Sequence, residues 1–296
     1  MKISTLADQY LKFTAARGAS PRTVEGYDAN YRQYIGFLMS RGLEDDLKNF
    51  TPETLADFID HLTDNRRKAS SVNVKLSGLA SLGEYGTKTK DSRGKYYLQE
   101  NPLYRVIRPK KVKPPEKYLG LVEMKAFMAL PKPATVQVAI DMILDTQCRA
   151  SELANADVAN VRLDGERLLL SVKVKGGNAK EIKLGADVSA KLLETLRFRE
   201  ARPTDPLLIN EKGDRYTRTT LSETVLRWAV RAGITRIQVR AHVLRHSIAT
   251  LASELNVEVA AIAAMLNHSD LHTVQKYIHR NSAADAARER VREALR

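Results

Sequence analysis

The chain has 296 residues, 43% of them hydrophobic and 28% charged, which is enough for two domains with apolar cores. No run of about 18 apolar residues occurs and Met1-Lys2-Ile3-Ser4 opens no apolar signal segment, so we expect a cytoplasmic protein without a membrane span. The single cysteine, Cys148, excludes an intramolecular disulfide, and 48 basic against 35 acidic residues give a net charge of +13. This excess of positive charge favours a polyanionic partner, with nucleic acid as the leading candidate.

Residues 1–100 are predicted to form a helical, DNA-binding domain without strands. A first helix should end near Gly18, and Ser20-Pro21 and Thr51-Pro52 are typical helix starts, with a capping hydroxyl followed by proline in the first turn. A fourth helix should begin at Ser70 or Ser71. Basic residues at the edges of these helices are either a solvated surface or phosphate contacts. The candidates for phosphate contacts are Arg22, Arg66 and Lys75.

Residues 101–118 are predicted to be a basic linker between two domains. Asn101-Pro102 interrupts the helical pattern, and further prolines favour an extended, semi-stiff segment. This segment contains six basic residues and one acidic residue, Glu116. A plain linker remains the alternative, but we expect one that also touches DNA through Arg105, Lys110, Lys111 and Lys113.

Residues 119–296 are predicted to be a mixed domain in which helices flank one small antiparallel sheet. The hydrophobic period changes to that of strands between residues 160 and 184. Asp164-Gly165 is a strong hairpin signal between two apolar strands, and Lys175-Gly176-Gly177-Asn178 predicts a second turn before a third strand. The whole chain is therefore expected to be mainly α, with two domains and a small antiparallel β-sheet.

Five of the six histidines lie between residues 242 and 279. His242 and Arg245 share one helix face, and His268 and Tyr277 follow beyond the next helix, so all four side chains could converge. A guanidinium fork, imidazole donors and a phenolic hydroxyl suit chemistry on a phosphate. A metal site is the weaker alternative, because Val243 stands where the H-E-x-x-H motif needs glutamate. We therefore expect no metal and no cofactor.

Three segments resemble the motifs of the tyrosine recombinase, or phage integrase, family. The stretch His242-Val243-Leu244-Arg245-His246-Ser247-Ile248-Ala249-Thr250 resembles the box H-x-L-R-H-[ST]-x-A-T, and Leu266-Asn267-His268 resembles the segment L-G-H. About a hundred residues earlier, Thr146-Gln147-Cys148-Arg149-Ala150-Ser151-Glu152-Leu153 resembles T-G-L-R-x-S-E-L. This sequence departs from the box where Gln147 replaces glycine and Cys148 replaces leucine.

The resemblance implies a role for each matching residue. Two arginines grip the scissile phosphate, two histidines assist, a hairpin lysine protonates the leaving 5′ oxygen, and a tyrosine attacks phosphorus. By position the catalytic residues are Arg149, Lys175, His242, Arg245, His268 and Tyr277. Lys173 and Lys180 are rivals of Lys175, while Glu152 is expected to orient Arg149 and Arg240 to add a backbone contact.

The resemblance also implies a partner and an assembly. The expected partner is double-stranded DNA carrying specific recombination sites, on which the protein works as a homotetramer. Ala284, Ala287, Val291 and Leu295 align on one face of a last helix, which packs on its own domain or is exchanged with a neighbouring subunit. A tyrosine-type topoisomerase and a non-enzymatic DNA-binding protein are the alternatives. Integration, excision and resolution of dimers or transposons use the same chemistry, so the sequence leaves the biological task and accessory proteins open.

Overall fold

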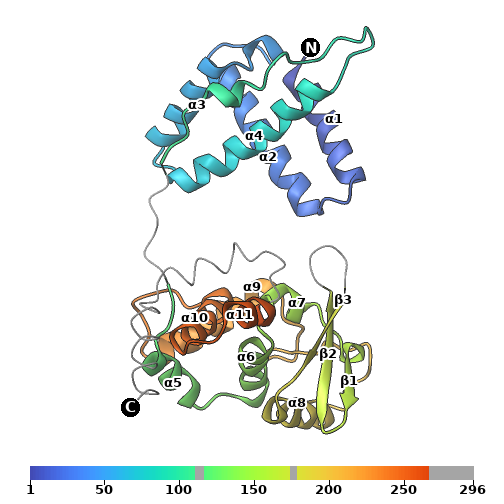
Figure 1. The fold of residues 1–296 in the computed structure, drawn as a ribbon, viewed down its shortest axis with the longest axis vertical. Helices are drawn as coiled ribbons and strands as arrows, with labels where there is room; N and C mark the ends of the chain where they lie inside the picture. Colours follow the sequence, from blue (N-terminus) through green and yellow to red (C-terminus); the bar gives the residue numbers. More distant parts are fainter. Residues whose placement is uncertain (111–116, 174–178, 267–296) are drawn as a thin grey trace, which may run out of the picture. The chain divides into compact units, whose positions relative to one another are not determined.

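The computed structural model describes residues 1–110, 117–173 and 179–266. The chain divides into two compact units, Met1–Pro114 and Pro115–Arg296 (Figure 1). Each unit has its own apolar core. The helices and a single three-stranded antiparallel sheet confirm the predicted fold class. None of the helices in the described ranges has the length and apolar character needed to cross a membrane.

Four α-helices build the described part of the first unit, residues 1–110, as the sequence predicts. At the second helix, Ser20 Oγ accepts a hydrogen bond from the backbone N of Thr23 at 3.2 Å. At the third, Thr51 Oγ1 accepts one from the backbone N of Thr54 at 3.3 Å. Each cap satisfies an N–H that the first helical turn leaves without a partner. The bounds are α1 Ile3–Ala16, α2 Pro21–Ser40, α3 Pro52–Asp64 and α4 Ala69–Lys88, with short 3-10 turns η1 Leu47–Asn49 and η2 Pro102–Arg105.

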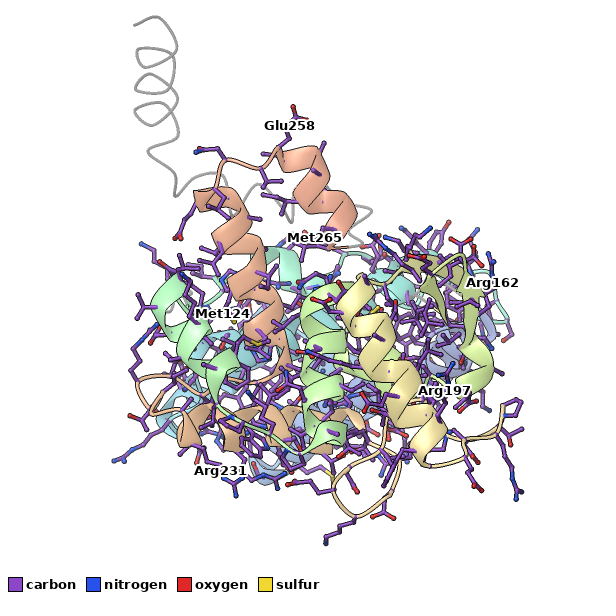
Figure 2. The ribbon with its side chains drawn as sticks, turned by 90° about the horizontal axis from the view of Figure 1, so that it is seen from below. Met124, Arg162, Arg197, Arg231, Glu258 and Met265 are labelled. Atoms are coloured by element: carbon purple, nitrogen blue, oxygen red, sulfur yellow. The ribbon has the colours of Figure 1, made fainter. Side chains whose placement is uncertain are left out.

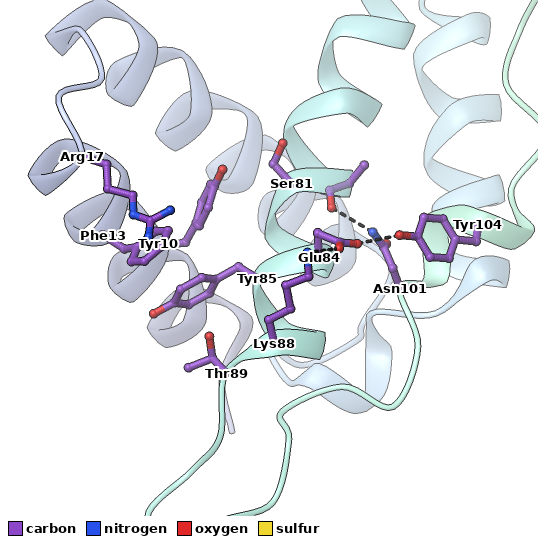
Figure 3. A pocket seen from close by; sticks show the side chains of 11 residues that line it. Tyr10, Phe13, Arg17, Ser81, Glu84, Tyr85, Lys88, Thr89, Asn101 and Tyr104 are labelled. Carbon is purple, nitrogen blue, oxygen red and sulfur yellow. Dashed lines mark hydrogen bonds and ion pairs between the residues drawn. The ribbon is translucent and has the colours of Figure 1, made fainter.

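Aromatic rings join α1 to α4 (Figure 3). The ring of Tyr85 lies 5.3 Å from that of Tyr10 and 5.2 Å from that of Phe13, measured between centroids. The Arg17 guanidinium lies 4.5 Å from the centre of the Phe13 ring, and these side chains line a groove of about 600 Å³ together with Glu84. Such tilted ring pairs add to the stability gained from apolar burial alone.

The first part of the predicted linker is attached to the first unit. Asn101 is buried, and its Nδ2 donates to the carbonyl of Ala80 on α4 at 2.9 Å. A Cβ at Gly83 would lie 2.3 Å from Asn101 Oδ1, so only glycine allows this approach. Further along, Asn73 Nδ2 donates to the carbonyl of Pro109 at 2.8 Å. Residues 101–109 therefore lie along α4 and contribute the buried Leu103 to the core of the first unit.

Helices of the second unit surround one apolar core. α6 lies at its centre, packed against α8, α9 and α10, and its Val136, Ala139, Ile140 and Ile143 are fully buried. The described helices of this unit are α5 Leu121–Ala129, α6 Ala134–Thr146, α7 Ala150–Ala154, α8 Ala186–Phe198, α9 Arg218–Arg231, α10 Ala241–Glu254 and α11 Val259–Met265, with a short turn η3 Val158–Asn160.

The sheet consists of β1 Val161–Asp164, β2 Arg167–Lys173 and β3 Ala179–Lys183, in the order β1-β2-β3. Asp164 pairs with Arg167, which leaves a two-residue hairpin loop in which Gly165 has φ +64°. The predicted Asp-Gly turn is thus confirmed, because glycine adopts this left-handed backbone without steric strain. Helix α8 packs against β2 (Figure 1), and its Ser189 Oγ accepts a hydrogen bond from Leu168 N at 3.0 Å.

Helix α11 packs on α10 through a small separate cluster. Ala249 of α10 meets Ile262, Ala263 and Leu266, all of which are buried. Figure 2 shows Glu258 and Met265 at opposite ends of this helix. The contact fixes the end of α11, and with it Leu266, against the helix that carries the histidine and arginine box.

Candidate active site

Arg245 lies inside the second unit and connects three segments that are remote in sequence. The residue is only 8% exposed. From α10, its Nη1 donates a hydrogen bond to the carbonyl oxygen of Gln147 and its Nη2 donates one to the carbonyl oxygen of Leu266. A buried guanidinium needs such acceptors, because desolvation without partners is strongly unfavourable. Arg245 therefore joins the segment before Arg149 to the segment before His268.

Gln147 ends α6 in a left-handed conformation, with φ +53° and ψ +24°. Its side-chain Nε2 donates to the carbonyl of Leu144 at 2.6 Å, and its own carbonyl accepts from Arg245. Glycine adopts this backbone most readily, which gives a physical reason for the glycine in the family's box. In this chain Gln147 adopts the left-handed conformation without being glycine, and α7 begins directly after Arg149.

Arg149 is held by Glu152 at the start of α7. Glu152 Oε2 accepts a hydrogen bond from the backbone N of Arg149 at 2.7 Å, and Oε1 accepts one from Nη1 at 2.8 Å. The Glu152 side chain is 7% exposed while that of Arg149 is 43% exposed. A carboxylate fixed on a helix thus holds an arginine whose guanidinium still reaches solvent, which leaves donors available for an anion.

A groove of about 560 Å³ opens beside Arg149. It runs between the α7 region and β2, and Lys173 at the end of β2 lies on its wall. Two cations from separate elements therefore line one groove, a favourable arrangement for an anionic ligand. The full lining is Arg149, Ser151, Glu152, Asn155, Ala156, Asp157, Asn160, Ser171, Val172 and Lys173.

The pKa of Cys148 depends on burial and on the charged side chains around this turn. Burial raises the pKa of its thiol to about 11, and the nearby carboxylate of Glu152 also raises it. The positive charges of Arg245 and Lys180 act in the opposite direction and lower the pKa. Charged side chains of α7, α10 and β3 therefore all act on the pKa of this thiol.

His242 lies in the first turn of α10, one turn before Arg245. Loss of solvent around the ring lowers its pKa, and the positive charges of Arg240 and Lys117 lower it further. All three causes disfavour the protonated ring. His242 is thus held toward the neutral form, which can accept a proton.

Ser247 has a structural role that the sequence did not predict. It is fully buried, and its Oγ accepts a hydrogen bond from the backbone N of Leu119 at 2.8 Å while donating to the carbonyl of Val243 at 2.7 Å. The Arg236 guanidinium also donates to the carbonyl of Tyr118 at 2.8 Å. The bond from Leu119 fixes the start of the second unit to α10, and the bond from Arg236 fixes it to the segment between α9 and α10. No motif in the sequence predicts contacts between residues so far apart.

Several predicted residues lie outside the described ranges. Among the catalytic candidates these are Lys175, His268 and Tyr277, and among the DNA-contact candidates Lys111 and Lys113. The structure thus describes Arg149, Glu152, His242 and Arg245, and it brings their segments together around the α6–α7 turn and α10.

The described candidates for DNA contacts differ in their surroundings. Arg22, Arg66 and Lys110 are exposed, whereas Lys75 is half-buried, and burial lowers its pKa. Arg105 is exposed but already pairs with Glu100, with 2.5 Å between Nη2 and Oε2. Arg240, directly before α10, lies within electrostatic range of His242.

Comparison with known proteins shows similarity along nearly the whole chain. The phage integrase family matches residues 118–284, and the N-terminal SAM-like domain of phage integrases matches residues 7–90. A tyrosine recombinase XerD from Staphylococcus saprophyticus is 26% identical over 290 residues, which cover 94% of each chain.

Two solved structures show the same fold. The XerH site-specific recombinase in a post-cleavage complex with palindromic difH substrate has a TM-score of 0.73 at 24% identity, over 99% of this chain and 84% of that one. A lambda integrase tetramer bound to a Holliday junction has a TM-score of 0.71 at 19% identity, over 94% and 77% of the two chains.

Proposed function

The chain belongs to the phage integrase family, and from that membership we propose how it carries out its reaction. It is a site-specific DNA recombinase that cleaves and rejoins DNA strands. Neither a tyrosine-type topoisomerase nor a non-enzymatic DNA-binding protein is favoured by the family match. The proposal concerns the residues that perform the chemistry, the DNA contacts and the assembly.

One observation supports the catalytic assignment above all others. The buried guanidinium of Arg245 donates to the carbonyl two residues before Arg149 and to the carbonyl two residues before His268. The guanidinium of an arginine carries five N–H donors in one planar fork, a geometry that matches the oxygens of a phosphate. We assign Arg149 and Arg245 the task of neutralising the charge that develops on a five-coordinate phosphorus, which planar forks perform well.

In the proposed reaction the phenolic oxygen of Tyr277 attacks the scissile phosphorus. A bond forms between this oxygen and phosphorus while the bond from phosphorus to the 5′ oxygen breaks, which leaves a 3′-phosphotyrosyl link. His242, held toward its neutral form, assists removal of the phenolic proton, and His268 donates a hydrogen bond to the phosphate. Lys175 gives a proton to the leaving 5′ oxygen. A 5′ hydroxyl of another strand then reverses the attack, so rejoining requires no ATP.

Glu152 acts in this proposal through Arg149. Its two hydrogen bonds fix both the backbone and the guanidinium of that arginine, so the fork is aligned before DNA arrives. A group held in its productive orientation loses little further freedom on binding, which lowers the barrier of the chemical step.

The basic side chains serve DNA binding in the same proposal. We assign backbone contacts to Arg22, Arg66, Lys75, Arg105, Lys110, Lys111, Lys113 and Arg240. Two duplexes are held by a homotetramer whose subunits exchange the C-terminal helix. The net charge of +13 supports a strongly salt-dependent affinity for duplex DNA.

Capture of the covalent intermediate tests the proposal. A preferred duplex is first selected from a random pool with the full chain, and a nicked suicide substrate of that sequence then traps the 3′-linked complex. We expect Tyr277→Phe to bind the duplex with unchanged affinity and to form no covalent complex, while the control Tyr96→Phe, on an exposed tyrosine of the first unit, forms it normally. A covalent complex with Tyr277→Phe would show that another tyrosine is the nucleophile.

A further inference from the structure

We infer that Gln147 is a positioning residue whose left-handed backbone turns its carbonyl oxygen onto Arg245 and so fixes that guanidinium for the reaction. This inference rests on the proposed function, because it assigns Arg245 a phosphate to hold. It adds a residue that touches neither the phosphate nor the nucleophile.

The backbone of Gln147 is unusual for a buried residue with a side chain. Four non-glycine residues of the described chain have a positive φ: Arg66, Gln147, Glu200 and Asn256. Three of them are exposed, whereas Gln147 is 0% exposed. A left-handed backbone is unfavourable for a residue with a Cβ, so the surrounding structure must hold it there.

Hydrogen bonds on both sides of Gln147 provide that hold. On the preceding side, its backbone N donates to the carbonyl of Ile143 at 3.2 Å and closes α6. On the following side, the backbone N of Cys148 donates to Thr146 Oγ1 at 3.1 Å. With both neighbours fixed, φ and ψ of Gln147 alone determine where its carbonyl oxygen points, and it points at Nη1 of Arg245.

The side chain of Gln147 contributes less than its backbone. Nε2 donates to the carbonyl of Leu144, but the buried Oε1 has no hydrogen-bond partner among the residues that the structure describes. An unsatisfied buried oxygen is itself unfavourable. The side-chain amide of Gln147 therefore does not explain why the left-handed turn is maintained. The hydrogen bond from Arg245 to the backbone carbonyl of Gln147 explains it.

If residue 147 left this conformation, its carbonyl would swing away from Arg245. The guanidinium would keep the carbonyl of Leu266 but lose its link to the turn that carries Arg149. A displacement of about 1 Å in a group that holds the reacting phosphate slows catalysis by about 100-fold. The rate of cleavage at saturating DNA is therefore the quantity that should respond.

Three substitutions at residue 147 distinguish the effect of its backbone conformation from the effect of its side-chain amide. Gln147→Gly and Gln147→Ala both remove the amide, but only glycine adopts the left-handed backbone freely, and Gln147→Val disfavours that backbone most. Glu200→Val is the matched control, because it places the same residue on an exposed left-handed backbone of the same unit. Single-turnover cleavage of the suicide substrate is measured at saturating DNA, together with the guanidinium NMR signals of Arg245, assigned by their loss in Arg245→Lys.

We expect Gln147→Gly to cleave fastest of the three variants, Gln147→Ala more slowly and Gln147→Val most slowly. The rate of Gln147→Gly should lie within about threefold of that of the unsubstituted protein, and the rate of Gln147→Val should be about 100-fold below it. The Nη signals of Arg245 should be resolved in the unsubstituted protein and in Gln147→Gly and averaged in Gln147→Val. Glu200→Val should change neither quantity, even where it lowers the melting temperature.

The inference is overturned if Gln147→Gly and Gln147→Ala cleave at equal rates, or if the Arg245 signals are the same in all three variants. The comparison of Gly with Ala stands even if Gln147→Val fails to fold. If the unsubstituted protein forms no covalent complex, the proposed function fails, whereas the Arg245 signals still decide the positioning role.

Discussion

Replacement of Arg245 by lysine should weaken the attachment of α11 to the rest of the second unit, although the apolar contacts of α11 with α10 remain. Each hydrogen bond from a charged donor to a buried carbonyl contributes roughly 1.5–3 kcal/mol. Within the described residues Arg245 donates to two such carbonyls, and a compact ammonium group on a flexible stem can keep only one of these two bonds. Loss of the bond to Leu266 lowers the local opening energy of α11 by about 2 kcal/mol. Amide exchange in that helix should therefore become about 30-fold faster.

Hydrogen exchange followed by NMR measures this effect directly. The reporters are the amides of Ile262 and Leu266, which donate to the carbonyls of Glu258 and Ile262 at 3.0 and 2.9 Å. Arg227→Lys is the control, because Arg227 lies on α9, forms an exposed ion pair with Glu211 in the turn before that helix, and should leave α11 unaffected. If Arg245→Lys remains folded and the two reporters exchange at unchanged rates, Arg245 does not anchor the end of α11 and the reasoning about its buried carbonyl bonds is wrong.

Three further predictions follow from the same unit. Glu152→Gln should weaken the ion pair that orients the Arg149 guanidinium, and should slow single-turnover cleavage about tenfold at unchanged DNA affinity. An unchanged cleavage rate would contradict the orienting role of Glu152. Ser247→Ala should leave the buried N–H of Leu119 without its acceptor and lower the free energy of unfolding by about 1–3 kcal/mol, as measured in urea; a loss within experimental error would show that water replaces the hydroxyl. His242 should titrate by NMR below the ordinary histidine value of 6.5 in the protein without DNA. Between the pKa of His242 in the folded protein and 6.5, the unfolded chain binds a proton on this ring that the folded chain does not bind. The free energy of unfolding should therefore decrease as the pH falls through that range. A measured pKa at or above 6.5 in the folded protein would contradict the burial of the ring.

Local signals in the sequence predicted the elements well. Ser20-Pro21 and Thr51-Pro52 start helices, and Asp164-Gly165 turns a hairpin, because caps and tight turns depend on residues that are neighbours along the chain. The fourth helix begins at Ala69, close to the predicted Ser70 or Ser71. Residues 101–109 show the limit of this reasoning, since their prolines suggested a linker while Asn101 and Leu103 are buried on the first unit.

The sequence by itself determined the two-part helical organisation, the basic character and the two boxes that carry Arg149 and Arg245, because composition and short motifs are properties of the linear chain. Only the tertiary structure decided that Gln147 presents its carbonyl to Arg245, that Glu152 holds Arg149, and that Ser247 fastens the start of the second unit. Two of these contacts join residues 98 and 128 positions apart. Such pairs meet only after the core has packed, and packing depends on the shapes of all its side chains together rather than on any one stretch of sequence.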